Sequence, residues 1–136
     1  MTPDQIALVI NSIEQLRPRS DEFATRFYEE LFALEPDARD LFPEDMALQR
    51  VKLFRELDEI AHAIPTLDNF VDRAQQLGAE HLGFGVERKH YVAFGNVLLV
   101  VLGEVLGDDL TPDLAEAWRV AYSLVADSMQ RGALEL

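Results

Sequence analysis

Residues 79–91 read Ala-Glu-His-Leu-Gly-Phe-Gly-Val-Glu-Arg-Lys-His-Tyr, and the rest of the chain is organised around this stretch. It places His81 in the last turn of one predicted helix, continues with a turn at residues 83–85, and begins a second helix that carries Tyr91. A histidine in this position is well placed to bind a metal, because one ring nitrogen can bond a carbonyl of the preceding turn while the other faces a ligand. Lone helical histidines also occur as surface or packing residues, so the interpretation depends on residues upstream.

The composition indicates one helical domain that comprises residues 1–136. Hydrophobic residues make up 49% of the chain, which is enough for a core and too many for a disordered chain. Only 7 glycines and 6 prolines are present, which favours helix. The chain has no cysteine, so it holds no disulfide, thiolate metal site or cysteine nucleophile, and this fits a cytoplasmic protein.

The formal net charge of −13 limits the partners of the chain. An acidic surface repels phosphate, so we expect binding neither to nucleic acid nor to anionic membranes. The N-terminus, Met-Thr-Pro-Asp, lacks the basic start of a signal peptide. The longest apolar run, residues 97–102, is too short to span a bilayer.

Hydrophobic residues recur at steps of three and four along the chain, which predicts an all-α fold with about six long helices and one short helical turn. Two of the predicted helices begin with Thr-Pro-Asp, which supplies a capping hydroxyl, a proline and an acid in the first turn. The predicted helices begin at Thr2, Ser20, about Glu44, Thr66, Glu87 and Thr111, and the short turn covers residues 37–41. The last helix is predicted to end at Gly132.

Four side chains stand out against this helical pattern. Gln49 interrupts an apolar face one turn before Leu53, although periodicity alone favours a position at the edge of that face, in water. Tyr28 lies beside the apolar stripe of its helix and is either an ordinary core tyrosine or a functional residue. Phe42 lies at a corner between helices and is either a core residue or a surface for a flat ligand. His62 lies off the apolar stripe and is predicted to be solvated.

The joint spacing of these residues resembles the globins, in particular the bacterial single-domain globins and the haem domains of flavohaemoglobins. Phe42 follows Tyr28 by 14 residues, and His81 follows Gln49 by 32. The resemblance covers essentially the whole chain and implies a globin fold around a haem pocket.

The resemblance also implies a role for each of these residues. His81 would be the proximal ligand of the iron in haem b, and Tyr28 and Gln49 would donate hydrogen bonds to a gas bound on the distal side. Further cofactor contacts would come from Phe42, Leu53, Val86, Tyr91, Phe94 and Leu98.

Two basic residues near Gln49 each allow more than one interpretation. Lys52 and Arg50 either reach the haem propionates or are solvated on the surface. Lys52 is also one turn from Gln49 and would ligate the iron in the absence of gas if the pocket desolvated its amine.

The function that the resemblance implies is reversible binding of oxygen and nitric oxide, with nitric oxide dioxygenation as the expected chemistry. No flavin or nicotinamide domain is expected in this chain, so turnover would need a separate reductase. The alternatives are non-enzymatic oxygen storage, delivery or sensing, and a haem-free interaction module. Both a monomer and a homodimer are compatible with the sequence.

Two positions depart from the flavohaemoglobin pattern. The glutamate that pairs with the proximal tyrosine in that family is replaced by Ala133, and Glu135 is predicted to point elsewhere. Glu80 stands where that family tends to carry a lysine. A strongly anionic proximal histidine is therefore not expected here.

Overall fold

The computed structural model describes residues 1–83 and 85–134, with residues 67–69 and 132–134 described by their backbone alone. All regular secondary structure in these ranges is helical, without a strand, as the sequence predicts. It forms α1 (Pro3–Leu16), η1 (Arg17–Arg19), α2 (Ser20–Leu34), η2 (Pro36–Leu41), α3 (Ala47–Ala63), α4 (Leu67–Gly83), α5 (Arg88–Leu106), η3 (Gly107–Asp109) and α6 (Pro112–Leu134), where η denotes a short 3-10 helix.

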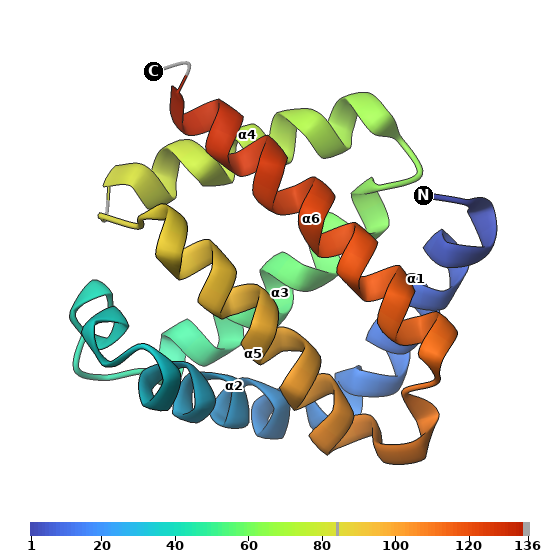
Figure 1. Cartoon of the computed structure of the whole chain (residues 1–136), viewed down its shortest axis with the longest axis horizontal. Coiled ribbons are helices and arrows are strands. Elements are labelled where there is room, and N and C mark those ends of the chain that lie inside the picture. The colour runs from blue at the N-terminus through green and yellow to red at the C-terminus, as the bar shows by residue number, and fades with distance from the viewer. Residues whose placement is uncertain (84, 135–136) are drawn as a thin grey trace.

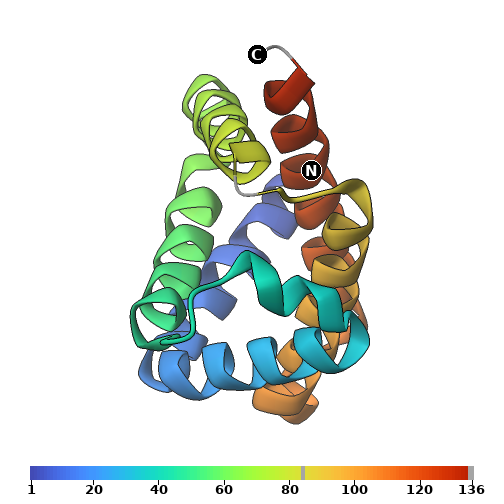
Figure 2. The same cartoon turned by 90° about the vertical axis from the view of Figure 1, so that its left-hand side faces the viewer.

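The helices pack across one another in pairs that are distant in sequence. Helix α4 packs chiefly on α6, α2 on α5, and α1 on α6 and α3. Figure 1 shows α4 and α2 on opposite sides of the molecule, with α3 and α5 running between them. Figure 2, turned by 90°, shows η2 and the start of α5 on the side that faces the viewer. This arrangement places the helix of His81 opposite the helix of Tyr28.

The two Thr-Pro-Asp sequences start helices as predicted. Thr2 caps α1 and forms a reciprocal capping box with Gln5, in which the Gln5 backbone N–H donates to the Thr2 hydroxyl at 3.1 Å. The hydroxyl of Thr111 accepts a hydrogen bond from the Leu114 N–H at 3.1 Å at the start of α6. In both cases the side chain satisfies one of the free N–H groups of the first turn.

Three predicted boundaries are wrong. Ser20 is the first residue of α2 rather than its cap, because η1 joins α1 to α2 without an extended residue between them. Helix α3 begins at Ala47, and the Asp45 carboxylate instead accepts a hydrogen bond from the Ala47 N–H at 3.0 Å. Helix α6 continues past Gly132 to Leu134.

The buried residues form two separate hydrophobic clusters. The larger joins α1, α2, α3, α5 and α6 around residues such as Ile13, Phe27 and Leu102. The smaller lies along α4, where Phe70, Ala74 and Leu77 pack with Ile60 of α3 and Met129 of α6. Tyr28 belongs to the larger cluster, whereas Leu77, one turn before His81, belongs to the smaller one.

Helix α5 is the most apolar helix of the described chain. An 18-residue window within Arg88–Asp109 has a mean hydropathy of 1.6, so this stretch is long and apolar enough to cross a membrane by those two criteria alone. In this fold its inner side chains, among them Val97, Val101 and Leu102, are buried in the larger cluster. Core helices of soluble proteins meet the same criteria, so this finding does not favour a membrane span.

Candidate functional site

His81 lies in the last turn of α4 with its two ring nitrogens in different surroundings. Its Nδ1 is 2.6 Å from the main-chain oxygen of Leu77, the bond to the preceding turn that the sequence predicts. Because a carbonyl only accepts, Nδ1 carries the proton, and in the neutral ring Nε2 keeps its lone pair. A hydrogen bond of this kind fixes the orientation of a metal-binding imidazole. Nε2 is therefore prepared to ligate a metal.

Tyr28 and Gln49 form a hydrogen-bonded pair between α2 and α3. The Nε2 of Gln49 donates to the Tyr28 hydroxyl at 3.1 Å, so Gln49 is turned toward Tyr28 rather than into water. Because the hydroxyl oxygen accepts this bond, the Tyr28 O–H proton remains available to a further acceptor. Tyr28 is only 5% exposed, and burial raises its pKa to about 12, so the hydroxyl stays protonated at neutral pH.

Aromatic and aliphatic residues surround this pair. The Phe42 ring meets the Tyr28 ring edge-on, with centroids 5.2 Å apart, and the Phe94 ring packs on that of Phe27 at 5.4 Å. Leu98 is fully within the larger cluster, and Leu53 packs against it from α3. Four apolar residues that the sequence predicts around a cofactor thus belong to or pack against the larger cluster, which contains Tyr28: Phe42, Leu53, Phe94 and Leu98.

The turn after α4 brings Val86 back to His81. Gly85 adopts a φ of +85°, a left-handed conformation that favours glycine, and its N–H donates to the Leu82 carbonyl at 3.0 Å. The Val86 N–H then donates to the His81 carbonyl at 3.2 Å. Phe84, in the middle of the predicted turn, lies outside the described residues.

Helix α4 packs against α6 with the two backbones in close approach at Gly78. A Cβ built on Gly78 would lie 2.6 Å from the Cα of Met129, so only glycine allows the two helices to approach this closely. The contact at Gly78 fixes how α4 lies on α6, and therefore the position of His81. On α5, the main-chain oxygen of Tyr91 accepts a hydrogen bond from the Tyr122 hydroxyl of α6 at 2.5 Å, so α6 also contacts the start of α5. Sequence reasoning did not identify Gly78, because nothing local marks a contact 51 residues away.

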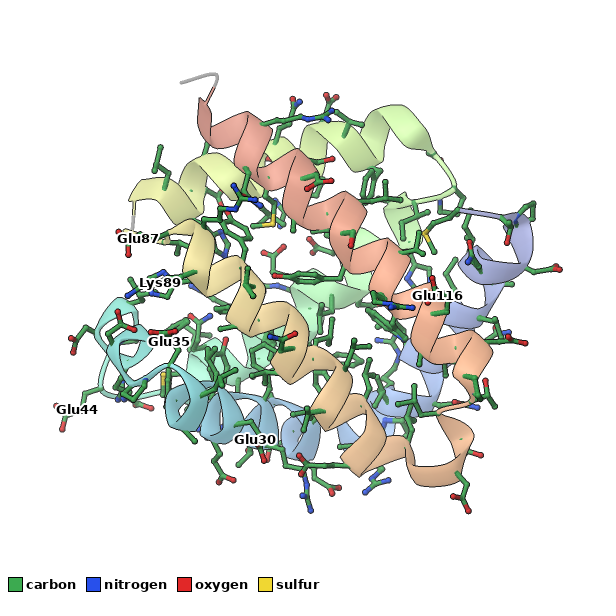
Figure 3. The ribbon with its side chains drawn as sticks, in the orientation of Figure 1. Glu30, Glu35, Glu44, Glu87, Lys89 and Glu116 are labelled. Carbon is green, nitrogen blue, oxygen red and sulfur yellow. The ribbon has the colours of Figure 1, made fainter. Side chains whose placement is uncertain are left out.

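A cluster of charged residues joins η2 to the start of α5, as Figure 3 shows for Glu35 and Lys89. The Lys89 ammonium pairs with Asp37 and lies 3.8 Å from Glu35. His90 is only 3% exposed; its Nδ1 accepts a hydrogen bond from the Glu87 N–H at 2.8 Å, and its Nε2 lies 3.9 Å from Asp37. This cluster holds the segment that precedes Phe42.

Sequence reasoning missed His90. The available signal was its position three residues after Glu87, at the start of a helix, where a side chain can bond back to the backbone N–H before the helix.

Lys52 and Arg50 lie on the outer side of α3. Lys52 is exposed, which favours the solvated interpretation over ligation of a metal. The Arg50 guanidinium lies 3.6 Å from Asp21. Arg50 also lines a surface cleft of about 240 Å³, and it is the only one of the residues predicted for a cofactor among the described residues that line this cleft. The walls are Arg17, Ser20, Asp21, Arg50, Val51, Phe54, Arg55 and Asp58.

A second histidine lies with two carboxylates on the surface of α1 and α3. Potential metal-ligating atoms of Glu14, Asp58 and His62 lie within 4.8 Å of one another. The Arg17 guanidinium already occupies both carboxylates, at 2.8 Å from Glu14 and 3.0 Å from Asp58. His62 itself is exposed, as predicted. The cation that holds this group together is therefore an arginine of the chain.

The two departures from the flavohaemoglobin pattern are only partly described. Glu80 is exposed on α4. Ala133 is described by its backbone alone, within α6, and Glu135 lies outside the described residues.

Comparison with known proteins identifies the family. The globin family model matches residues 25–129. The chain is 29% identical to a flavohemoprotein of Bacillus subtilis over 126 residues, which are 90% of this chain and 32% of that protein. It is 30% identical to a flavohemoprotein of Bacillus thuringiensis over 127 residues, or 90% of this chain and 31% of that protein. The chain thus spans about a third of the length of these curated relatives.

Two solved structures share the whole fold. A bacterial globin from Campylobacter jejuni has a TM-score of 0.87 at 22% identity and covers 98% of this chain and 97% of its own. An engineered carbene transferase, made from a candidate nitric oxide dioxygenase of Rhodothermus marinus, has a TM-score of 0.87 at 27% identity, over 99% of this chain and 94% of its own. With the family model matching more than half of its residues, this chain belongs to the globin family.

Proposed function

We propose that the chain binds haem b through His81 and uses it to bind oxygen and nitric oxide, with nitric oxide dioxygenation as its chemistry. The observation that carries the proposal is the direction of one hydrogen bond. Gln49 donates to Tyr28, which leaves the Tyr28 proton free for an acceptor in the candidate site. Haem supplies an iron atom that binds diatomic gases and exchanges single electrons.

The residues of the site fit that cofactor. His81 offers a lone pair on Nε2, with its orientation fixed by the Leu77 carbonyl. The two separate hydrophobic clusters supply apolar surface on the α4 side and on the α2 side, which suits a flat apolar disc. The absence of cysteine from the sequence supports haem b, because thioether attachment needs cysteine.

In this proposal Tyr28 and Gln49, the distal pair, determine how tightly a gas is held. Oxygen bound by a haem protein carries partial negative charge, and a protonated tyrosine in a buried site stabilises such charge by donating to it. The raised pKa of Tyr28, about 12, keeps this donor protonated throughout the neutral range. Gln49 fixes the tyrosine and has a second N–H to donate. We therefore expect tight binding and slow release of oxygen.

Slow release favours redox chemistry over oxygen delivery. Dioxygenation combines oxygen and nitric oxide to nitrate and takes up one electron in each turnover, which we propose comes from a separate reductase in the cytoplasm. The flavohemoprotein relatives and the Rhodothermus marinus neighbour support this choice. An oxygen storage or delivery protein would instead release its ligand rapidly.

The first experiment tests the cofactor. His81→Ala should be purified with no haem absorption band or should lose its pigment rapidly, and the matched control His62→Ala, an exposed histidine of α3, should keep the pigment. If His81→Ala retains haem as firmly as the natural protein, the proposed ligand is wrong.

The second experiment tests the distal pair in the haem-loaded protein. Tyr28→Phe and Gln49→Leu should each speed oxygen release about tenfold, the equivalent of one good hydrogen bond of ~1.4 kcal/mol. Gln15→Leu makes the same change as Gln49→Leu at an exposed glutamine of α1, outside the site, and should leave oxygen release unchanged. Nitrate formation from nitric oxide is then measured with an added reductase. Unchanged release in both distal variants would refute the assignment of this pair.

A further inference from the structure

The exposed residues of α5 form a single ridge. Apart from Lys89, the exposed positions of this helix recur every fourth residue, at Arg88, Val92, Asn96, Val100 and Glu104. Val92 is 59% exposed and Val100 is 51% exposed. Side chains four residues apart form one of the ridges by which helices pack on each other. Figures 1 and 2 both show α5 on an outer face of the molecule, beside α6.

This ridge is uncharged in its middle although the protein as a whole is strongly acidic. The most apolar 18-residue window within Arg88–Asp109 has a mean hydropathy of 1.6, yet only 39% of that window is buried in the chain. Val92, Asn96 and Val100 carry no charge, whereas the net charge of the whole chain is −13. Two copies of the chain repel each other through their acidic surfaces and can approach most closely along an uncharged strip.

The ridge is also self-complementary about its centre. Val92 and Val100 lie four residues on either side of Asn96, and Arg88 and Glu104 lie eight residues on either side, with opposite charges. A two-fold axis at Asn96 would place each valine against the other valine of the second copy, and each arginine against a glutamate. A two-fold interface requires this kind of self-matching surface.

We propose that this ridge is the contact surface of a homodimer in which the two α5 helices cross antiparallel at Asn96. Among the described residues Arg88 makes no ion pair within its own chain. Glu104 accepts from Arg26 at 2.9 Å through one carboxylate oxygen, which leaves its second oxygen for Arg88 of the second copy. The proposal is independent of haem and of the proposed function.

The contact is small, and the dimer is accordingly weak. Ridges formed by every fourth residue cross at about −50°, so the two helices diverge on both sides of Asn96. Only the long side chains of Arg88 and Glu104 reach across at the ends. Interfaces of this size, below roughly 1,200 Å² in total, belong to transient complexes. The dimer should therefore depend on protein concentration.

Charge reversal in sedimentation experiments tests the antiparallel arrangement. The natural chain should form dimers as its concentration rises, and Arg88→Glu and Glu104→Arg should each weaken dimerisation by about tenfold or more, because like charges then face each other. An equimolar mixture of the two variants should dimerise again, since each arginine meets a glutamate of the other variant. A wild type that stays monomeric up to about 1 mM, the upper limit of useful weak affinities, or a mixture that does not recover, would overturn the proposal.

A cysteine placed on the axis gives a second test, because the chain has no cysteine of its own. Asn96→Cys should form a disulfide-linked dimer under mild oxidation, whereas Val92→Cys alone should not, because its two copies lie on opposite sides of the axis. Equal cross-linking of the two variants would contradict the arrangement. A different outcome would be that the natural chain binds phosphatidylcholine vesicles, that Val92→Asp does not, and that the natural chain forms no dimer at high concentration. That result would show that the ridge binds lipid instead and would also overturn the proposal.

Discussion

Replacing Gly78 by alanine should destabilise the protein through one backbone contact. Gly78 lies where α4 meets α6, and a Cβ there would be 2.6 Å from the Cα of Met129 and closer still to its carbonyl carbon and oxygen. Carbon atoms in favourable contact lie about 3.5–4.0 Å apart, so the helices must separate by about 1 Å. Because the obstruction is backbone, no side-chain rotation can relieve it.

The expected size of the effect follows from two opposing contributions. Forcing an extra carbon into a packed interface costs about 1–3 kcal/mol, and a contact with backbone belongs at the upper end, ~3 kcal/mol. Alanine is the better helix former by ~1 kcal/mol, which offsets part of this cost. The net loss in the free energy of unfolding is then ~2 kcal/mol, or roughly 5–10 °C in Tm for a domain of this size.

Thermal unfolding followed by circular dichroism measures this loss, with Gly83→Ala as the matched control. Gly83 is the last residue of the same helix, and a Cβ there would meet nothing within 4 Å. Its variant should keep the natural Tm or exceed it slightly. The reasoning is refuted if Gly78→Ala is as stable as Gly83→Ala, because α4 and α6 would then tolerate a side chain at their closest approach.

Three smaller changes test other contacts. Ser12→Ala should lose about 1–3 kcal/mol of stability in urea unfolding, because the Trp118 indole N–H, which donates to the Ser12 hydroxyl at 2.8 Å in the core, loses its acceptor. In an alkaline titration read by phenolate absorbance, Tyr28 should ionise only near pH 12. Because its pKa in the folded state is raised above the unfolded ~10, the stability advantage of the natural chain over Tyr28→Phe should be full below pH 10 and should decrease as the pH rises from 10 toward 12. Arg17 lowers the pKa of Asp58 below its usual ~3.9, so Asp58→Asn should be less stable at pH 7 and equal to the natural chain near pH 2, as acid unfolding at several pH values would show.

Helix starts were predictable where the whole signal is local. Thr2 and Thr111 each carry the hydroxyl, the proline and the acid within three residues, and both helices begin as expected. Ser20 has the right side chain for a cap, but the chain reaches it through η1, with Arg17 to Arg19 already in helical geometry. The backbone N–H of Ser20 bonds the Arg17 carbonyl, so no cap is needed.

The candidate site was predictable in its residue types and less so in their orientation. Periodicity alone favoured a solvent-facing Gln49, because the spacing of apolar residues within one helix contains no information about Tyr28, 21 residues earlier in the chain. In the structure, the hydrogen bond to Tyr28 turns the Gln49 side chain inward. His90 escaped notice because its burial depends on the η2 segment around Asp37. The assignment of His81 as an iron ligand, and of the other site residues to the cofactor, stays a prediction.

The two sides of the candidate site depend on different parts of the fold. His81 is positioned by α4, which is set by the contact of Gly78 with α6, whereas Tyr28 and Gln49 are positioned by the packing of α2 on α3. Neither contact shares a residue with the other, so a change on α6 can move His81 while the Tyr28–Gln49 bond stays intact. Under the proposed function, two chains with the same three residues would therefore differ in gas affinity if α4 lay differently on α6, because affinity would depend on the separation of the two sides and not only on their side chains.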